Sequence, residues 1–414
     1  MRFFLTLMMS AYVLFAADAT IEVVKEADRM PSIAVEDASV DYTGTPAKRF
    51  YRLLLGDMNV LALFNVDQHY ATTHFDNDAV LNKKMDYTLR FRLRSDDAGG
   101  FLVDAKLMRQ NDTVMQKSYR VAGQRMSPFI SHAIAYDVNE YFGQPAMEWL
   151  KRKVIFTRLK GNMQSEIIIA DYTLTYQHVM VKGGLNVFPK WADEEHTAFY
   201  YTALSGKKPT LYKIDVRSGK RSAMLSSDGM LVCSDVSRDG RELLLTMAPQ
   251  GQPDIYLFDA VRKSAKRITM YGGIDVNGQF MSDGRIAFIS NRMGFPNVFA
   301  KKIDGNKVEQ LVFYGKNNSA CSAYKDYIVY KARETDNSFG PNTFNLHLIS
   351  MKTDFIRRLT ATGINEFPRF SDDGDAIIYI KNYKQQSAIG IIRLTQNKNF
   401  LFPLASGKIQ SLDW

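Results

Sequence analysis

The chain has 414 residues, of which 46% are hydrophobic and 23% are charged, and its formal net charge is +9. This length allows two domains, and these proportions are ordinary for a globular protein. The positive charge is spread along the chain, as in Arg90-Phe91-Arg92-Leu93-Arg94, where charged and apolar residues alternate as on a half-exposed strand. The pattern therefore disfavours a nucleic-acid-binding protein.

The first 17 residues are predicted to be a secretory signal peptide. Met1-Arg2 supplies a positive charge, an apolar run follows from Phe3 to Phe15, and the cleavage site is expected between Ala16 and Ala19. The run is too short to span a bilayer, and no later stretch is comparable. The region of the cut also lacks the cysteine that a lipoprotein needs. We therefore expect an exported chain that does not span a membrane.

Residues 18–146 are predicted to form a small α/β domain with helices on a short sheet. Residues 21–24 alternate like a strand, residues 46–60 place apolar side chains at helical spacing, and three strands are expected at 87–94, 101–109 and 114–121. Ser127 is expected to cap a second helix, with Pro128 at its first position. Gly143-Gln144-Pro145 is expected to end that helix at the domain boundary.

A repeat with a period of 43 to 47 residues fills residues 147–414. Its anchor positions are Trp191, Val236, Phe280, Ala323, Phe370 and Trp414. Asp-Gly pairs at 239–240, 283–284 and 373–374 predict two-residue hairpin turns in which both residues have positive φ. A second series with the same period, Asp171, Asp215, Asp259 and Asp304, marks another turn. Together the two series predict an all-β six-bladed β-propeller with four strands in each blade.

The last four residues, Ser411-Leu412-Asp413-Trp414, begin one more inner strand. A single strand cannot bury itself, so we expect it to pair with the first unit near residues 153–156 and to close the ring. The two cysteines, Cys233 and Cys321, fall on units two repeats apart and are expected to be free, partly buried thiols.

Motifs for catalysis, cofactor binding and metal binding are missing from the sequence. It has no Gly-x-Ser-x-Gly elbow, no Cys-x-x-Cys pair and no glycine-rich phosphate loop before a helix. No histidines pair at metal-ligand spacing; His69 and His74 are interpreted as surface residues and His347 as packed on a strand. The repeated aspartates could ring a cation, but hairpin turns need the same residues. We therefore expect a binding surface with no catalytic residue, metal or cofactor.

The organisation of the chain resembles the TolB family of the Tol–Pal envelope system, from the export signal to the closing strand. The repeats closest to the family pattern are Pro189-Lys190-Trp191 and Pro368-Arg369-Phe370-Ser371-Asp372-Asp373-Gly374, and Ala323-Tyr324-Lys325-Asp326 departs from it most. The resemblance implies a non-enzymatic, monomeric adaptor of the periplasm. It also implies a role in outer-membrane integrity and in constriction at cell division.

The resemblance further implies that loops ahead of the inner strands bind the lipoprotein Pal at one mouth of the channel. Loops of one type open on the same face of a propeller, which agrees with this geometry. The residues onto which the site carries over are Asn186, Val187, Phe188, Met230, Cys233, Asp275, Val276, Asn277, Asn318, Ser319, Asn365, Glu366, Phe367 and Gln410. Their apolar members are suited to the dry centre of an interface.

A second partner implied by the resemblance is the inner-membrane protein TolA, bound by the mature N-terminal segment, residues 19–25. Within it Thr20, Ile21, Glu22, Val23 and Val24 alternate like a strand that can add to a sheet edge. In the family, Pal binding favours the sequestered state of this segment, so the segment is expected to act as a switch.

Two other functions stay open from the sequence. A propeller enzyme, such as a peptidase remnant or a lyase, would need a nucleophile or a histidine cluster at the channel. A glycan-binding propeller would stack aromatic side chains of its rim on cell-wall sugars.

Overall fold

The computed structural model of the protein describes residues 29–77, 79–96, 100–335, 342–384 and 386–414. The predicted signal peptide, its cleavage site and the predicted strand at 21–24 lie outside the described residues. No helix among the described residues combines the length and the hydropathy needed to cross a bilayer.

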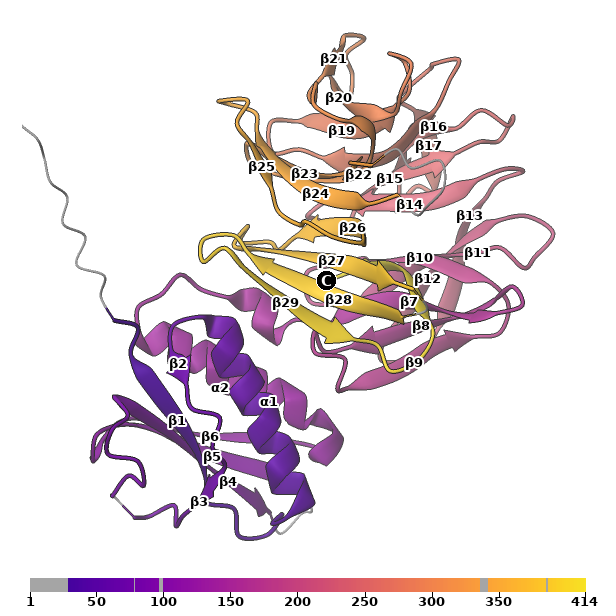
Figure 1. Cartoon of the computed structure of the whole chain (residues 1–414). Coiled ribbons are helices and arrows are strands. Elements are labelled where there is room, and N and C mark those ends of the chain that lie inside the picture. Colours follow the sequence, from indigo (N-terminus) through magenta and orange to yellow (C-terminus); the bar gives the residue numbers. More distant parts are fainter. Residues whose placement is uncertain (1–28, 78, 97–99, 336–341, 385) are drawn as a thin grey trace, which may run out of the picture.

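The first part of the described chain is an α/β unit in which two helices pack side by side on a mixed sheet (Figure 1). Its elements are β1 (Ser32–Asp37), α1 (Thr45–Leu61), β2 (Asn65–Val66), β3 (Ala71–Thr72), β4 (Tyr87–Ser95), β5 (Phe101–Arg109), β6 (Asp112–Val121), a short 3-10 turn at Gln124–Met126 and α2 (Ser127–Tyr141). The sheet order is β2-β1-β4-β5-β6, with β3 also pairing with β1. The helix at 46–60 and the three strands are confirmed.

The start of α2 differs from its prediction. Ser127 does not cap the helix, because it is already helical with φ −54° and ψ −32°, and no side chain caps this end. The 3-10 turn at Gln124–Met126 leads straight into α2, so the chain has no extended residue at which a cap could form. Pro128 lies in the first turn, but as the second helical residue, one position later than predicted.

The rest of the described chain is a β-propeller of repeated antiparallel four-stranded units, preceded by a 3-10 turn at Glu148–Lys151. The first unit has the order β30-β7-β8-β9 and therefore combines the last strand with three early ones. Its strands are β30 (Lys408–Asp413), β7 (Val154–Gly161), β8 (Gln164–Ala170) and β9 (Gln177–Lys182).

The next three units follow the chain without crossovers. Their strands are β10 (Asn186–Trp191), β11 (Ala198–Ala203), β12 (Thr210–Asp215) and β13 (Arg221–Ser226); β14 (Leu231–Val236), β15 (Glu242–Met247), β16 (Asp254–Asp259) and β17 (Ser264–Arg267); β18 (Asp275–Phe280), β19 (Arg285–Ser290), β20 (Asn297–Lys302) and β21 (Val308–Gln310).

The eight strands from β22 to β29 form two further groups of four that are joined in one sheet by a single bridge between Phe344 and Ile364. They are β22 (Lys316–Tyr324), β23 (Tyr327–Arg333), β24 (Phe344–Ser350), β25 (Ile356–Arg358), β26 (Ile364–Phe370), β27 (Ala376–Tyr383), β28 (Gln386–Arg393) and β29 (Lys398–Pro403).

The Asp-Gly turns are wider than the predicted two-residue hairpins. Only the glycines have positive φ, at 70° for Gly240, 80° for Gly284 and 75° for Gly374, and each glycine N–H donates to the carbonyl three residues earlier. The aspartate before each glycine accepts a bond from the backbone N–H two residues further on, at 3.0 to 3.2 Å. This side-chain bond holds the aspartate at negative φ, so the prediction of positive φ at both positions was wrong.

Apolar clusters fill the spaces between neighbouring units. Ile167 and Phe199 pack between the first two units, and Leu244 and Phe288 pack between two later ones. These side chains are fully buried because both faces of each sheet are covered by neighbouring sheets.

The α/β unit and the propeller share one apolar core. It runs from Leu54 and Val138 through Trp149 to Phe156 and Ile391. Trp149 packs edge-on against Tyr172 at 5.6 Å between ring centroids and lies 5.5 Å from Trp414. The chain therefore holds its two parts together by continuous packing.

A buried polar cluster lies in the same seam. His132 of α2 binds Asp57 of α1 through Nδ1 at 2.9 Å and Asp171 of the propeller through Nε2 at 3.2 Å. The Ser131 and Tyr172 hydroxyls also donate to Asp57. Burial by itself lowers the pKa of His132, but the two carboxylates outweigh burial and raise that pKa to about 9. His132 is therefore a cation that bridges both parts of the chain at neutral pH.

Candidate binding surfaces at the mouths of the propeller

The first strands of successive units contact one another around the propeller axis, in the order β10, β14, β18, β22, β26, β30 and back to β10. Hydrogen bonds join neighbouring inner strands: Phe188 N–H donates to Ser411 Oγ at 3.1 Å, and Phe280 N–H donates to Asp235 Oδ2 at 2.8 Å. We call the end where these inner strands begin the N-mouth, and the end where they finish the C-mouth.

The residue just before each anchor lines the centre of the propeller. These positions carry polar side chains: Lys190, Asp235, Gln279, Ser322, Arg369 and Asp413. Sequence reasoning missed them, although a polar residue one position before every anchor was a visible signal. The strand register, which only the structure gives, makes them neighbours.

The central charges compensate one another. Lys190 Nζ lies 2.5 Å from Asp413 Oδ1, and the Arg369 guanidinium lies 3.9 Å from both Asp235 and Asp413. Arg369 also donates to the Ser234 carbonyl at 2.6 Å and to the Gln279 side chain. Burial and the neighbouring Arg369 lower the pKa of Lys190, and burial raises the pKa of Asp235. The cluster thus ties five inner strands, β10, β14, β18, β26 and β30, together across the channel.

A cavity of about 540 Å³ opens above this cluster at the C-mouth. Its wall includes Trp191, which stacks on His196 at 4.1 Å between ring centroids, and an ion pair between Arg152 and Asp372 at 2.6 Å. Burial and Arg152 lower the pKa of His196 to about 3. His196 is therefore a neutral packing partner of Trp191 near neutral pH.

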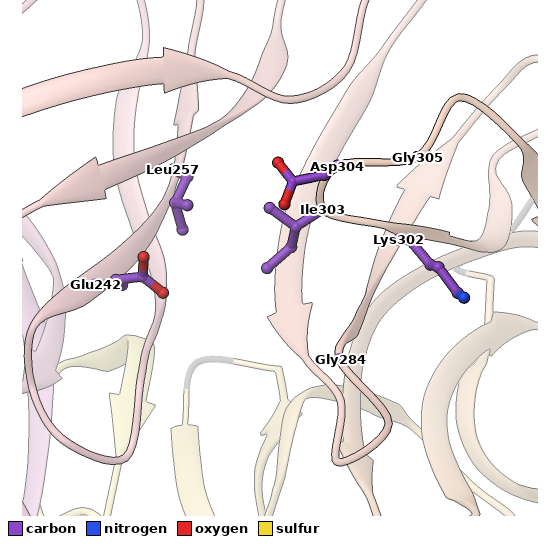
Figure 2. Close-up of a pocket in the computed structure, with 7 residues that line it drawn as sticks. All are labelled: Glu242, Leu257, Gly284, Lys302, Ile303, Asp304 and Gly305. Carbon is purple, nitrogen blue, oxygen red and sulfur yellow. The ribbon is translucent and has the colours of Figure 1, made fainter.

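A second depression lies between the C-mouth ends of two neighbouring units. Figure 2 shows Glu242 and Leu257 on one side of it and Lys302, Ile303 and Asp304 on the other. It lies at the opposite end of the propeller from the predicted site loops, because these residues lie on C-mouth turns or on the strands next to them. Within the described residues, no group of three or more His, Cys, Asp or Glu side chains is placed to hold a metal ion.

Several residues expected to bind a partner at the N-mouth are buried. These are Asn186, Val187, Cys233, Asp275, Asn318 and Asn365. The side-chain amide of Asn186 donates to Gly183 O at 2.8 Å, that of Asn318 to Tyr314 O at 2.8 Å and that of Asn365 to Thr362 O at 3.1 Å. Each asparagine thereby closes the loop ahead of its inner strand and fixes the shape of the N-mouth.

The remaining predicted residues reach the surface in part. Met230 is 49% exposed, and partial exposure is found for Phe188, Val276, Asn277, Ser319, Glu366, Phe367 and Gln410. Phe188 and Phe367 lie 6.3 Å apart between ring centroids and have positive φ of 54° and 49°. Such backbone strain costs on the order of 1–3 kcal/mol at a non-glycine residue and is often found at functional sites.

Further apolar side chains at the N-mouth were not predicted. They lie on the loops before β18 and β22 and on the β19–β20 turn, and they are Met270, Ile274, Met293, Phe295, Phe313 and Tyr314. Two of the three loops had been identified, but these residues precede the predicted positions. A single sequence offered no signal that separates an exposed phenylalanine in a loop from a buried one.

The two cysteines are free, as expected, and are buried more deeply than predicted, at 2% exposure each. Burial raises the pKa of Cys233 and of Cys321 to about 12. Both thiols are therefore packing residues of low reactivity. Of the histidines, His69 and His74 are exposed, and His347 is buried on β24, where it binds Glu334 at 2.9 Å, so all three expectations are confirmed.

Comparison with known proteins finds a family and individual relatives that the chain is similar to. The family described as "TolB beta propeller domain" matches residues 148–414. The chain is 47% identical to the Tol-Pal system protein TolB of Wolinella succinogenes, over 100% of both chains. It is 43% identical to the Tol-Pal system protein TolB of Campylobacter jejuni, over 97% of this chain and 96% of the relative. A crystal structure of TolB from Acinetobacter baumannii shares the fold, with a TM-score of 0.74 at 18% identity over 93% of this chain and 97% of the other.

Proposed function

The chain belongs to the TolB family of Tol-Pal system proteins, and on that premise we propose that it is a non-enzymatic periplasmic adaptor. In this proposal the N-mouth binds the lipoprotein Pal, the N-terminal segment at residues 19–25 binds TolA, and the protein supports outer-membrane integrity and constriction at cell division. It works as a monomer, exported by a signal peptide at residues 1–17.

The proposed architecture is a closed ring of six blades at residues 147–414, behind an α/β domain at 18–146. Support for closure comes from the pairing of β30 with β7 and from the contact of β30 with β10. The Trp414 indole N–H also donates to the Phe370 carbonyl at 2.9 Å, so the chain end is bonded on both sides. A ring without free edges gives a rigid platform for docking.

The observation that carries the proposal is that more apolar side chains are exposed at the N-mouth than at the C-mouth, where Val261, Tyr327 and Phe355 are exposed. Met230 of the predicted loops lies exposed, and Phe188 and Phe367 form a strained aromatic pair at the same mouth. Contiguous exposed apolar groups mark interaction sites in soluble proteins. We propose that the exposed members of the predicted set contact Pal. The buried asparagines and Cys233 would support the N-mouth loops beneath that contact and fix their conformation.

The TolA-binding role of residues 19–25 lies outside the described residues and is supported by family membership. In the proposed switch, Pal binding favours the sequestered state of the segment and TolA binds the released state, because the two partners prefer different states of it.

Capture of purified Pal by variants of the mature protein tests the proposal. Met230→Glu combined with Val276→Glu should abolish Pal capture, because two charges would be buried in an apolar contact. The matched control, Val261→Glu, alters a side chain that is 77% exposed on the β16–β17 turn at the C-mouth and should bind normally. Unchanged Pal capture by a folded double variant would exclude the N-mouth.

Deletion of residues 19–25 separates the two partners. The deleted protein should lose TolA binding while its Pal affinity changes by less than a few fold. Loss of Pal binding with intact TolA binding would reverse the assignment of the two sites.

A further inference from the structure

We infer that the N-mouth consists of two chemically unlike halves and that its partner docks with an apolar element over one half and an acidic surface over the other. This inference deepens the proposed function and rests on it for the identity of the partner. It specifies the chemistry that the docking face of Pal must present to this chain.

The apolar half lies over two neighbouring units. Phe313 is 79% exposed and Tyr314 is 57% exposed on the loop before β22, while Met270 and Ile274 are exposed on the loop before β18. Met293 and Phe295 stand on the β19–β20 turn between these loops. Aromatic and methionine side chains are enriched in the centres of protein interfaces because they bury a large area for little lost entropy.

The cationic half lies over the first unit and its two neighbours. Lys160 stands at the end of β7, Lys408 at the start of β30, Lys182 at the end of β9, Lys207 on the β11–β12 loop and Lys384 on the β27–β28 turn, and all are exposed. Among the described residues, no carboxylate forms an ion pair with any of these five. The nearby Glu166 and Asp228 are already engaged, by Arg158 at 2.6 Å and by Lys208 at 2.5 Å.

Ion pairs occur at both mouths, but the C-mouth has a different charge pattern because its turns carry exposed carboxylates that pair with many of its cations. Examples are Arg238 with Glu194 at 2.8 Å, Lys266 with Asp304 at 2.9 Å and Lys352 with Asp326 at 2.6 Å. Exposed cations without an ion pair also occur among the described residues of the C-mouth, such as Arg217, Lys220 and Lys302, but exposed carboxylates such as Asp215 and Asp304 lie on the same turns. The excess of positive charge is therefore larger at the N-mouth. The partner that complements this excess carries carboxylates beside its apolar contact.

The two halves are expected to act on different rate constants. Exposed charges contribute little to affinity once they are paired in water, but they steer encounter and raise the association rate at low salt. Buried aromatic contacts chiefly slow dissociation.

Binding kinetics of the full mature chain with Pal from the same bacterium, purified without its lipid, test the inference. The variant Lys160→Glu/Lys207→Glu/Lys408→Glu should lower the association rate by at least about tenfold at about 50 mM salt, and this loss should nearly vanish at about 500 mM salt. The matched control, Arg217→Glu/Lys220→Glu/Lys302→Glu, makes the same charge change on exposed residues at the C-mouth and should alter the rate less than about twofold. Phe313→Ala should raise the dissociation rate by about tenfold or more.

The outcomes separate the inference from the function it rests on. If the unaltered protein fails to bind Pal, the proposed function is wrong. If the unaltered protein binds and the N-mouth and C-mouth triple variants associate equally fast, the division into halves is wrong. Equal dissociation of Phe313→Ala and the unaltered protein would also overturn it. All substituted side chains are exposed, and thermal unfolding of each variant establishes that it is folded.

Discussion

His132 connects the two parts of the chain, because its fully buried ring forms an ion pair with Asp57 of the α/β unit and another with Asp171 of the propeller. Replacing it with glutamine leaves two carboxylates buried without their cation. We expect His132→Gln to lower the free energy of unfolding by about 3–5 kcal/mol, the usual cost of breaking a buried pair from one side. Urea unfolding at pH 7 measures this change. His69→Gln is the control, because His69 is 93% exposed, and it should change stability by no more than about 0.5 kcal/mol.

The same residue sets a pH dependence. The folded pKa of His132 is about 9, above the value of about 6.5 in the unfolded chain. Its contribution to stability is therefore complete below about pH 6.5 and is lost as the pH rises through 9. The stability difference between the natural protein and His132→Gln should shrink between pH 7 and pH 10. A difference that stays constant over this range would show that His132 is not a buried cation.

The residues at the propeller centre show what a single sequence can and cannot predict. The anchors Trp191, Phe280 and Phe370 lie at the ends of inner strands, a place that the repeat alone did not assign to them. The central residues one position earlier were missed because their chemistry varies from lysine to aspartate to glutamine, so that only polarity, and no residue type, repeats. Their shared property is a place in the strand register, and pairing between distant strands determines that place.

At the scale of elements, the Asp-Gly turn between β26 and β27 can be compared with its repeat between β18 and β19. Gly374 and Gly284 have similar positive φ, but a Cβ at Gly374 would meet the Tyr324 ring at 2.0 Å, whereas a Cβ at Gly284 would meet nothing within 4 Å. Gly284→Ala should cost about 1–2 kcal/mol from backbone conformation alone. Gly374→Ala should cost more, because Tyr324 must move and lose its bond to the Asp373 carbonyl at 2.7 Å.

Chemical denaturation of both glycine variants measures this difference, with Gly284→Ala as the matched control. Equal losses of stability in the two variants would mean that the Tyr324 ring moves aside without a cost in free energy. The existence of these turns was predictable from Asp and Gly at a fixed period, but their type was not. The type depends on which backbone N–H the aspartate side chain binds, and a sequence pattern does not specify that bond.

At the scale of the whole molecule, the helices, strands and repeat period followed from local patterns, whereas the joint between the parts did not. Gly143-Gln144-Pro145 marks a real end of α2 at Tyr141. Yet the apolar core is continuous from the α/β unit into the propeller beyond this point, since Trp149 packs between Tyr172 and Trp414. Contacts between residues so distant in sequence leave no periodic signal in the chain.

A continuous core predicts that the α/β unit and the propeller unfold together. Differential scanning calorimetry of the mature protein should show one transition whose calorimetric and van't Hoff enthalpies agree. Trp149→Ala removes the side chain at the centre of the seam and should uncouple the parts into two transitions. Phe288→Ala removes a side chain that is equally buried between propeller sheets, so it should lower the midpoint while a single transition persists. Each of the two substitutions costs about 3–5 kcal/mol of local stability. A difference in the number of unfolding transitions therefore reflects where the side chain lies and not how much stability its loss removes. Two resolved transitions in the natural protein would mean that the seam is too weak to transmit a change from the N-terminal part to the mouths of the propeller.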